Sequence, residues 1–354
     1  MQNLNLKNAD YLKALRQEKT AKTPIWIMRQ AGRYLPEYRK IRAQAGSFMG
    51  LCTNPELAAQ VTLQPLERFD LDAAIIFSDI LTIPDAMGLG LNFKEGEGPI
   101  FTHKIKNLED INNLIIFDPC EKLSYVMEAI KLTKQHLKPS IPLIGFSGSP
   151  WTLACYMIQG QSSKDFSEPK KMLYTNPGLL HQLLKLLTQA VTDYLLAQIQ
   201  SGVDSLMIFD TWGGLLTPHA YEHCSLFYMA QIIQNIKSQY PSMPITLFTK
   251  GGGLFLENLF NSGADCVGLD WTIDIKKARE INLNRTALQG NLDPCVLHGT
   301  EDQIHQEVSR ILSQAGAHPG HIFNLGHGIT PEIDPGKVKF LVDLVHSMSA
   351  HYHE

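Results

Sequence analysis

The feature that most constrains this chain is a repeated unit, in which a short apolar run ends in polar or Gly residues and a helical stretch follows. Eight such runs occur, at residues 24–28, 73–78, 142–146, 205–209, 245–248, 264–269, 286–289 and 321–325. The runs are apolar throughout and rarely alternate with polar residues, which is typical of parallel strands covered on both faces. The α/β class is therefore expected, as a (β/α)8 barrel of the TIM type or as a doubly wound open sheet.

The barrel is favoured because the count is eight and no Gly-x-Gly-x-x-Gly motif opens the first unit. No low-complexity segment or Gly/Ser linker marks a boundary, so residues 1–354 are expected to form a single barrel domain. Between the second and third units, residues 88–105 are Gly-rich with alternating segments. This pattern predicts a small β-hairpin excursion from the barrel.

Several helix boundaries can be predicted from capping signals. Asn54-Pro55-Glu56 combines an N-cap residue with Pro at the first helical position, and Thr330-Pro331-Glu332 repeats this pattern before the last helix. A long amphipathic helix is predicted over residues 179–200, with a stop at Ser201-Gly202, and another over residues 301–315.

Charge and cysteine usage narrow the class of protein. A net charge of −4 argues against general nucleic-acid binding, which requires a spread basic surface. No apolar run approaches 18 residues, and Met1 to Asp10 shows no basic and apolar pattern of a signal peptide. The six cysteines form no Cys-x-x-Cys pair and read as reduced thiols, so a cytoplasmic location is expected.

Arginine is concentrated in one short stretch. The chain has nine arginines, and four of them lie between positions 29 and 42. Arg29 and Arg33 flank a Gly after the first apolar run, while Arg39 and Arg42 lie one turn apart on a helix expected to begin at Pro36. Since guanidinium groups pair bidentately with carboxylate or phosphate, the stretch predicts a clamp for a ligand with several acidic groups; a solvated basic face is the alternative.

In a barrel of this kind the active site lies where the strands end, so the residues that follow each run are candidates. They are Arg29 and Arg33, Asp79, Ser147 and Gly148, Asp210 and Thr211, Lys250 to Gly253, Asp270, Asn291 and Asp293, and Gly326-His327-Gly328. Asp79 and His327 carry titratable side chains suited to chemistry, although Asp79 could cap the next helix and His327 could bond to backbone. Tyr156, in the helix after the third run, is by default a core tyrosine.

Two patterns point elsewhere but lack support. His219-Ala220-Tyr221-Glu222-His223 matches the His-x-x-Glu-His motif of a zinc peptidase family, yet no second motif supplies a third ligand. Gly251-Gly252-Gly253 could cradle a phosphate, but no Lys-Ser/Thr follows it, so a tight turn is the better interpretation.

Five segments together resemble one family. Met28-Arg29-Gln30-Ala31-Gly32-Arg33-Tyr34-Leu35-Pro36 resembles the N-terminal signature of the uroporphyrinogen decarboxylase family, and residues 145–153 resemble its second signature. The segments 77–81, 208–212 and 324–328 also follow in the order and spacing of that family. The resemblance covers nearly the whole chain.

The resemblance implies a single (β/α)8 barrel that works as a homodimer without a metal or an organic cofactor. It implies conversion of uroporphyrinogen III to coproporphyrinogen III in tetrapyrrole (heme) synthesis, with loss of CO2 from four acetate side chains. The family's functional residues correspond to Arg29, Arg33, Arg42, Asp79, Tyr156, Thr211 and His327. Many relatives have Ser where this chain has Thr211, and some have Phe where it has Tyr38.

The implied roles follow from the chemistry of the substrate. Eight carboxylates on the substrate explain an arginine cluster in an acidic protein, and loss of CO2 from a pyrrole acetate requires a protonated pyrrole ring as electron sink. Asp79 would accept hydrogen bonds from the pyrrole N–H groups and balance that positive charge. Arg29 and Arg33 would hold acetate and propionate groups, and Tyr156, Thr211 and His327 would supply further hydrogen bonds. Arg29 would also deliver or position the proton, although the pKa of arginine is above about 12.

Two other functions compete with this interpretation. Related zinc-dependent corrinoid methyltransferases need a His-x-Cys pair at a strand end, whereas the fifth run here ends Phe248-Thr249-Lys250-Gly251. A non-catalytic tetrapyrrole-binding protein would keep the arginines but could dispense with Asp79.

Overall fold

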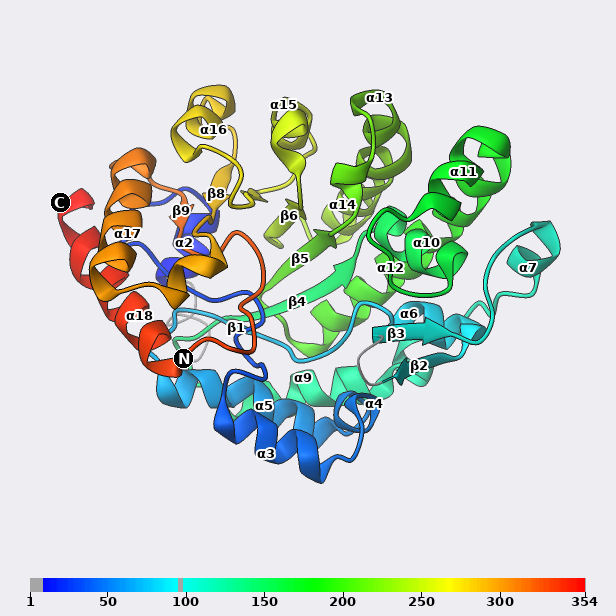
Figure 1. The fold of residues 1–354 in the computed structure, drawn as a ribbon, viewed down its shortest axis with the longest axis horizontal. Helices are drawn as coiled ribbons and strands as arrows, with labels where there is room; N and C mark the ends of the chain where they lie inside the picture. The colour runs from blue at the N-terminus through cyan, green and yellow to red at the C-terminus, as the bar shows by residue number, and fades with distance from the viewer. Residues whose placement is uncertain (1–8, 95–97, 354) are drawn as a thin grey trace.

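The chain forms a closed ring of parallel strands surrounded by helices in a computed structural model that describes residues 9–94 and 98–353. Most of the segment Met1 to Asp10 and residues 95–97 of the predicted hairpin lie outside the described residues. In Figure 1 the helices surround the curled sheet in chain order, from blue α3 and α5 through green α10 to red α18. The strands are β1 (Ala74–Ile75), β2 (Leu91–Lys94), β3 (Gly98–Phe101), β4 (Leu143–Gly148), β5 (Ser205–Asp210), β6 (Ile245–Thr249), β7 (Cys266–Gly268), β8 (Ala287–Gln289) and β9 (His321–Ile322).

The α-helices fill the segments between the strands and extend to the C-terminal end of the described chain. They are α2 (Asp10–Leu15), α3 (Pro36–Gln44), α4 (Phe48–Cys52), α5 (Pro55–Arg68), α6 (Thr82–Pro84), α7 (Leu108–Asn112), α8 (Pro119–Lys122), α9 (Ser124–His136), α10 (Pro150–Gln159), α11 (Ser167–Thr175), α12 (Pro177–Ser201), α13 (Pro218–Tyr221), α14 (Phe227–Gln239), α15 (Leu256–Phe260), α16 (Ile275–Asn282), α17 (Glu301–Ala315) and α18 (Pro335–Ser349). Among these described helices, none is both long and apolar enough to cross a membrane.

Seven of the eight predicted runs pair as one parallel sheet in the order β1-β4-β5-β6-β7-β8-β9. The first run, residues 24–28, closes the ring between the two ends of this sheet. Ile25 forms a parallel bridge with Phe323, and the Ile25 carbonyl accepts a hydrogen bond from the Asp72 amide at 2.9 Å. The (β/α)8 architecture is therefore confirmed, with a single bridge where a longer first strand was expected.

Alternate residues of the strands separate the core into two layers. Trp26, Ile144, Met207, Phe248 and Ile322 belong to a cluster inside the ring, which also contains residues of α2. Their neighbours along the strands belong to the larger cluster between the sheet and the outer helices. Because both faces of each strand are buried, the runs are apolar throughout.

The predicted helix signals are largely confirmed. The Asn54 side chain caps α5 by accepting from the Leu57 amide at 2.9 Å, and α12 ends at Gly202 with a φ of 111°. The prediction that Thr330-Pro331-Glu332 starts the last helix is wrong. That helix begins at Pro335, because the Asp334 side chain supplies the cap. The predicted hairpin is confirmed as the antiparallel pair of β2 and β3.

Three aspartates at the amino ends of strands fix neighbouring strands in the same way. Each accepts a hydrogen bond from the first amide of the preceding strand, and each also pairs with a basic side chain from a helix. The amide bonds are Ile25 to Asp72 (2.8 Å), Leu143 to Asp204 (2.7 Å) and Ile245 to Asp265 (2.7 Å). The basic partners are His346 on Asp72 (2.7 Å), Lys134 on Asp204 (2.7 Å) and Lys237 on Asp265 (2.6 Å). Each carboxylate therefore links its own strand to the preceding strand and to a helix. All three lie at the end of the barrel opposite the candidate residues.

Removing the carboxylate of Asp72 should destabilise the barrel where it closes. We expect Asp72→Ala to lower the free energy of unfolding by about 2 kcal/mol, since it leaves the Ile25 amide without its partner. Urea denaturation measures this change. The control is Asp70→Ala: Asp70 lies 3.6 Å from His346 but its side chain is 80% exposed, so a loss under about 1 kcal/mol is expected. Equal losses in the two variants would contradict the role given to Asp72.

Candidate functional site

The turn that carries Arg29 is held in place by side chains from neighbouring strands. Gln30 accepts a hydrogen bond from the Ile27 amide at 3.1 Å and donates to the Ala73 carbonyl at 3.2 Å. The Met28 amide donates to the Asn324 side chain at 2.9 Å. Arg29 itself has a φ of 66°, a left-handed conformation that costs a non-Gly residue about 1 kcal/mol or more. The surrounding bonds over-determine this conformation, which is typical of a functional turn.

The glycines around His327 allow the loops above the barrel to approach closely. A Cβ atom on Gly328 would overlap with the side chain of Arg29, and one on Gly326 would overlap with the backbone of Trp271. The sequence identified Gly326 and Gly328 as neighbours of a candidate histidine. The structure gives a physical reason for the two glycines, because they bring His327 against Arg29 and Trp271.

Three of the four clustered arginines have unused guanidinium groups. Within the described residues, Arg29, Arg33 and Arg42 make no hydrogen bond or ion pair through their side chains. Arg39 differs, because it donates to the carbonyl oxygens of Arg33 at 2.7 Å and Tyr34 at 3.2 Å. The cluster thus contains one structural arginine and three that remain available for an anionic ligand.

Asp79 uses one carboxylate oxygen in a structural hydrogen bond and leaves the other available to a ligand. Its Oδ1 accepts from the Leu81 amide at 2.8 Å, but the next helix, α6, has no side-chain cap, so the alternative that Asp79 caps that helix is wrong. No other described residue donates to its Oδ2. Burial raises the pKa of Asp79, and the Leu81 amide and the positive charge of Arg29 counteract this shift. One carboxylate oxygen therefore has no donor among the described residues, within the electrostatic influence of Arg29.

The charge of Arg29 links the other candidates. It also acts on Tyr156 and His327, so these side chains share one neighbourhood with Asp79. Burial, followed by the charges of Arg29 and Lys250, lowers the pKa of His327 from about 6.5 to about 3. His327 is therefore neutral near pH 7 and offers one donor and one acceptor nitrogen.

Tyr156 is half-buried on α10, within an aromatic cluster. Its ring packs against Phe166 and Trp212, with ring centroids 5.2 and 6.2 Å apart. Burial raises the pKa of Tyr156, and the negative charge of Asp79 raises it further. The phenol therefore remains a neutral hydrogen-bond group.

The charges of Arg33 and Arg42 affect the pKa values of two neighbouring side chains, Tyr38 and Cys52. Burial raises the pKa of Tyr38 to about 12, against the charges of Arg42 and Arg33. Burial and the charge of Asp79 raise the pKa of Cys52, while Arg42 lowers it. Cys52 thus lies within electrostatic reach of both Asp79 and Arg42, which connects the helical arginine to the carboxylate.

Thr211 is positioned by a buried carboxylate next to it. Asp210 is fully buried and accepts hydrogen bonds from four hydroxyl groups. Their donors are Ser149 at 2.6 Å, Thr152 at 3.0 Å, Ser225 at 2.8 Å and Thr249 at 3.4 Å. The Thr152 hydroxyl also accepts from the Trp212 amide at 3.2 Å, so the backbone is fixed on both sides of Thr211.

The other strand-end candidates have structural roles. Asp270 accepts from the Gly251 amide and the Thr272 amide, and Asp293 caps the turn after β8 through the Cys295 amide at 2.9 Å. Asn291 donates to the carbonyl oxygens of Asp270 and Ile273. Ser147 donates to the Gly148 carbonyl. Gly251 has a φ of 72°, which agrees with the tight turn expected there.

The zinc-peptidase pattern has no supporting site. His219 and His223 pack with ring centroids 4.5 Å apart on the outer surface. In the described part of the chain, no three His, Cys, Asp or Glu residues form a group that could hold a metal ion.

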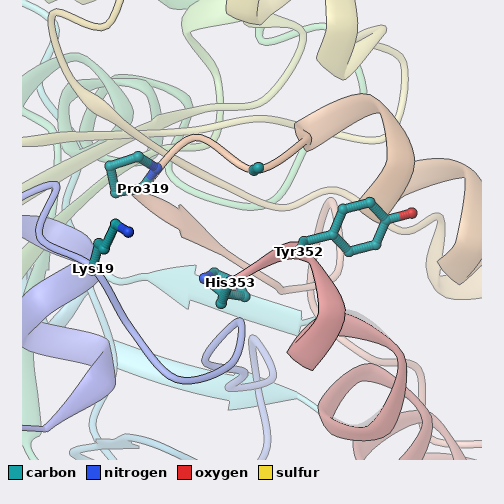
Figure 2. Close-up of a pocket in the computed structure, with 5 residues that line it drawn as sticks. Lys19, Pro319, Tyr352 and His353 are labelled. Atoms are coloured by element: carbon teal, nitrogen blue, oxygen red, sulfur yellow. The ribbon is translucent and has the colours of Figure 1, made fainter.

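One cavity of about 120 Å³ lies away from these residues. Figure 2 shows that its lining comes from Lys19 after α2, from Pro319 before β9, and from Tyr352 and His353 near the C-terminus. Pro319 precedes a strand, whereas the candidates follow strands. This cavity is therefore at the other end of the barrel from the candidate site.

Sequence reasoning gave no role to two residues that border the site. Trp271 follows β7 and packs against His327 with ring centroids 6.2 Å apart. Lys250 was among the strand-end candidates, but the sequence could not predict that its charge lowers the pKa of His327. The available signal for both was their position directly after a strand.

Comparison with known proteins gives matches along nearly the whole chain. The family model described as "Uroporphyrinogen decarboxylase" matches residues 6–348. A protein named uroporphyrinogen decarboxylase from Nitrosococcus oceani is 55% identical over 98% of this chain and 98% of its own length. One of the same name from Tolumonas auensis is 56% identical over 99% of both chains.

Solved structures give likenesses of fold. A methyltransferase from Methanosarcina mazei has a TM-score of 0.81 at 23% identity, covering 96% of this chain and 98% of that one. A B12-independent methionine synthase from Shewanella sp. W3-18-1 has a TM-score of 0.56 at 10% identity, covering 95% and 97%. At these identities the likenesses concern the fold alone.

The neutral state of His327 can be tested by titration. We expect its ring NMR signals to stay unchanged from pH 8 to pH 5, because burial and two nearby cations oppose protonation. The folded pKa is lowered, so its contribution to stability is present above pH 6.5 and is lost as the pH falls toward about 3. His327→Asn identifies the signal by its disappearance. A titration midpoint near 6.5 would contradict this environment.

Proposed function

The chain belongs to the uroporphyrinogen decarboxylase family, and on this premise we propose how its own residues act in the reaction. The enzyme removes CO2 from the acetate side chains of uroporphyrinogen III, giving coproporphyrinogen III in tetrapyrrole synthesis. The observation that best supports a role for these residues is the common influence of Arg29 on Asp79, Tyr156 and His327.

Substrate carboxylates would be held by Arg29, Arg33 and Arg42. Their guanidinium groups make no other bond within the described residues, and each can offer paired donors to a carboxylate. The left-handed turn at Arg29 supports this assignment, because the hydrogen bonds of Met28 and Gln30 fix the backbone on both sides of Arg29. Held carboxylates would orient the reacting pyrrole ring.

Each decarboxylation replaces a carboxylate by hydrogen. In our proposal a proton adds to the pyrrole ring, CO2 leaves, the resulting methylene carbon takes a proton and the ring releases its own. The net change is one proton consumed and one CO2 released. The ring is cationic while the C–C bond breaks, so the enzyme must stabilise positive charge at that moment.

Asp79 would provide this stabilisation. The free Oδ2 can accept pyrrole N–H groups while Oδ1 stays bonded to the Leu81 amide, which keeps the carboxylate in a fixed orientation. Since all four pyrrole N–H groups can point toward the centre of the macrocycle, one carboxylate would serve each ring in turn. Preorganised charge of this kind needs no rearrangement during the reaction.

The neutral groups would complete the binding of the macrocycle. His327, Tyr156 and Thr211 can each donate a hydrogen bond without adding charge near the cationic ring. Arg29 would position the transferred proton or deliver it, since its charge acts on Asp79. Asp79, Arg29, Tyr156 and His327 are thus the proposed catalytic residues.

The assembly of the protein is also a proposal. Family membership favours one catalytic domain over residues 1–354, working as a homodimer in the cytoplasm without a metal or an organic cofactor. Light scattering after size-exclusion chromatography tests the dimer directly.

The activity itself has a direct test. We expect purified, metal-stripped protein under anaerobic conditions to convert uroporphyrinogen III through seven-, six- and five-carboxylate intermediates to the four-carboxylate product. Chromatography of the oxidised products resolves these species. Unchanged substrate together with tight binding would instead support a carrier protein, and activity that returns only with zinc would support metal-dependent chemistry.

Asp79→Asn should separate binding from catalysis. We expect kcat to fall by about 100-fold or more, because the amide cannot balance a cationic ring, while the dissociation constant for uroporphyrinogen III changes little. The matched control is Asp293→Asn, since Asp293 also follows a strand and caps the amide two residues later, at 2.9 Å. Near-normal turnover by Asp79→Asn would refute the proposed charge balance.

A further inference from the structure

The backbone of Lys250 is fixed between the ends of three neighbouring strands. Lys250 follows β6, and its amide donates to the carbonyl oxygen of Asp210 at the end of β5, at 3.2 Å. The next amide, that of Gly251, donates to the carboxylate of Asp270 after β7. A Cβ on Gly214 would overlap with the Lys250 carbonyl oxygen, so the β5 loop also packs against this residue. Lys250 therefore starts from a well-defined position.

Its side chain lies between two indole rings. The Nζ atom is 5.7 Å from the ring centroid of Trp212 and 5.9 Å from that of Trp271. Trp212 in turn packs against Tyr156, and Trp271 packs against His327. Lys250 thus stands between the aromatic neighbours of two proposed site residues, and cation–π attraction restrains its ammonium group there.

The ammonium group has no anionic partner in the part of the chain that the structure describes. Within the described residues, Lys250 Nζ makes no hydrogen bond or ion pair. Its charge nevertheless reaches the site, because it acts on His327 together with Arg29. Ring faces leave the N–H donors of an ammonium group unsatisfied, so a ligand acceptor would complete its coordination.

The position of Lys250 in the ring complements that of the arginine cluster. The closed order of strands runs from residues 24–28 through β1, β4 and β5 to β6, and on through β7, β8 and β9 back to the start. Counting either way, β6 is four places from residues 24–28. Lys250 and Arg29 therefore follow strands on opposite sides of the barrel, as a macrocycle with carboxylates around its rim would require.

From this placement we propose that Lys250 is a further substrate-binding residue, holding a carboxylate on the edge of the tetrapyrrole across the barrel from the arginines. The inference rests on the proposed function, which supplies the polycarboxylate. The two indole rings would shield this ion pair from water and so strengthen it.

The test compares Lys250→Met with Lys250→Arg. Methionine keeps the apolar length of the side chain and removes the charge, whereas arginine keeps the charge and can stack between the two rings. We expect Lys250→Met to raise the KM for uroporphyrinogen III about 10-fold or more with kcat within about 3-fold of the wild type. Lys250→Arg should restore KM to within about 3-fold.

Direct binding separates this inference from the proposed function. Anaerobic ultrafiltration with uroporphyrinogen III gives dissociation constants without turnover, and Lys250→Met should bind about 10-fold more weakly, with a shallower dependence on salt. An inactive wild type would refute the proposed function yet leave this comparison intact. Equal affinity of Lys250→Met and wild type, or an equally weak Lys250→Arg, would overturn the inference.

Discussion

Closure of the barrel through residues 24–28 is the constraint on which the rest of the structure depends. An open parallel sheet would leave unpaired amides and carbonyls on β1 and β9, and a closed one leaves none of its edges exposed. The bridge from Ile25 to Phe323 and the bond from Asp72 to Ile25 supply this closure. Closure also determines function, because it brings Arg29, from the first unit, against Gly328, after the last strand. Residues at the two ends of the sequence thereby form one site.

The two ends of the barrel use carboxylates differently. At the amino ends, Asp72, Asp204 and Asp265 each pair with one backbone amide and one basic side chain, so they contribute stability. At the carboxyl ends, Asp210 is equally occupied by four hydroxyl groups. Asp79 bonds only to the Leu81 amide among the described residues, with no basic side chain or hydroxyl bonded to it, while the charge of Arg29 acts on it. A half-buried carboxylate with an unbonded oxygen is available to a ligand, which is why Asp79 is the candidate for chemistry.

The sequence predicted the architecture well because the relevant signals are local. Apolar runs, Pro at first helical positions and the Gly after α12 act through neighbouring residues, so the eight strands and most helix boundaries could be inferred. The start of the last helix could not, because Asp334 and Thr330 are both plausible caps and only packing selects between them. Likewise Asp79, Asp210, Asp270 and Asp293 look alike after a strand. The hydroxyl partners of Asp210 and the Gly251 amide on Asp270 come from other segments of the barrel, whereas Asp79 and Asp293 each accept from an amide two residues later, so only the fold distinguishes these carboxylates. Lys250 was named among the strand-end candidates, but its place between two indole rings could not be predicted, since Trp212 and Trp271 come from the adjacent units.

The charges of the site bear on how a reaction of four successive steps can finish. The proposed site has four cations, Arg29, Arg33, Arg42 and Lys250, and one proposed catalytic carboxylate, Asp79, so it carries excess positive charge for an anion with eight carboxylates. Each decarboxylation removes one negative charge from the macrocycle while the cations of the site remain unchanged. The Coulomb attraction between ligand and site therefore decreases with each CO2 lost. Because the cations lie on opposite sides of the barrel, they would bind an intermediate in which either edge of the macrocycle has already lost carboxylates. They would bind the four-carboxylate product more weakly than any intermediate. The same charges that favour binding of the substrate then favour release of the product only when the series is complete.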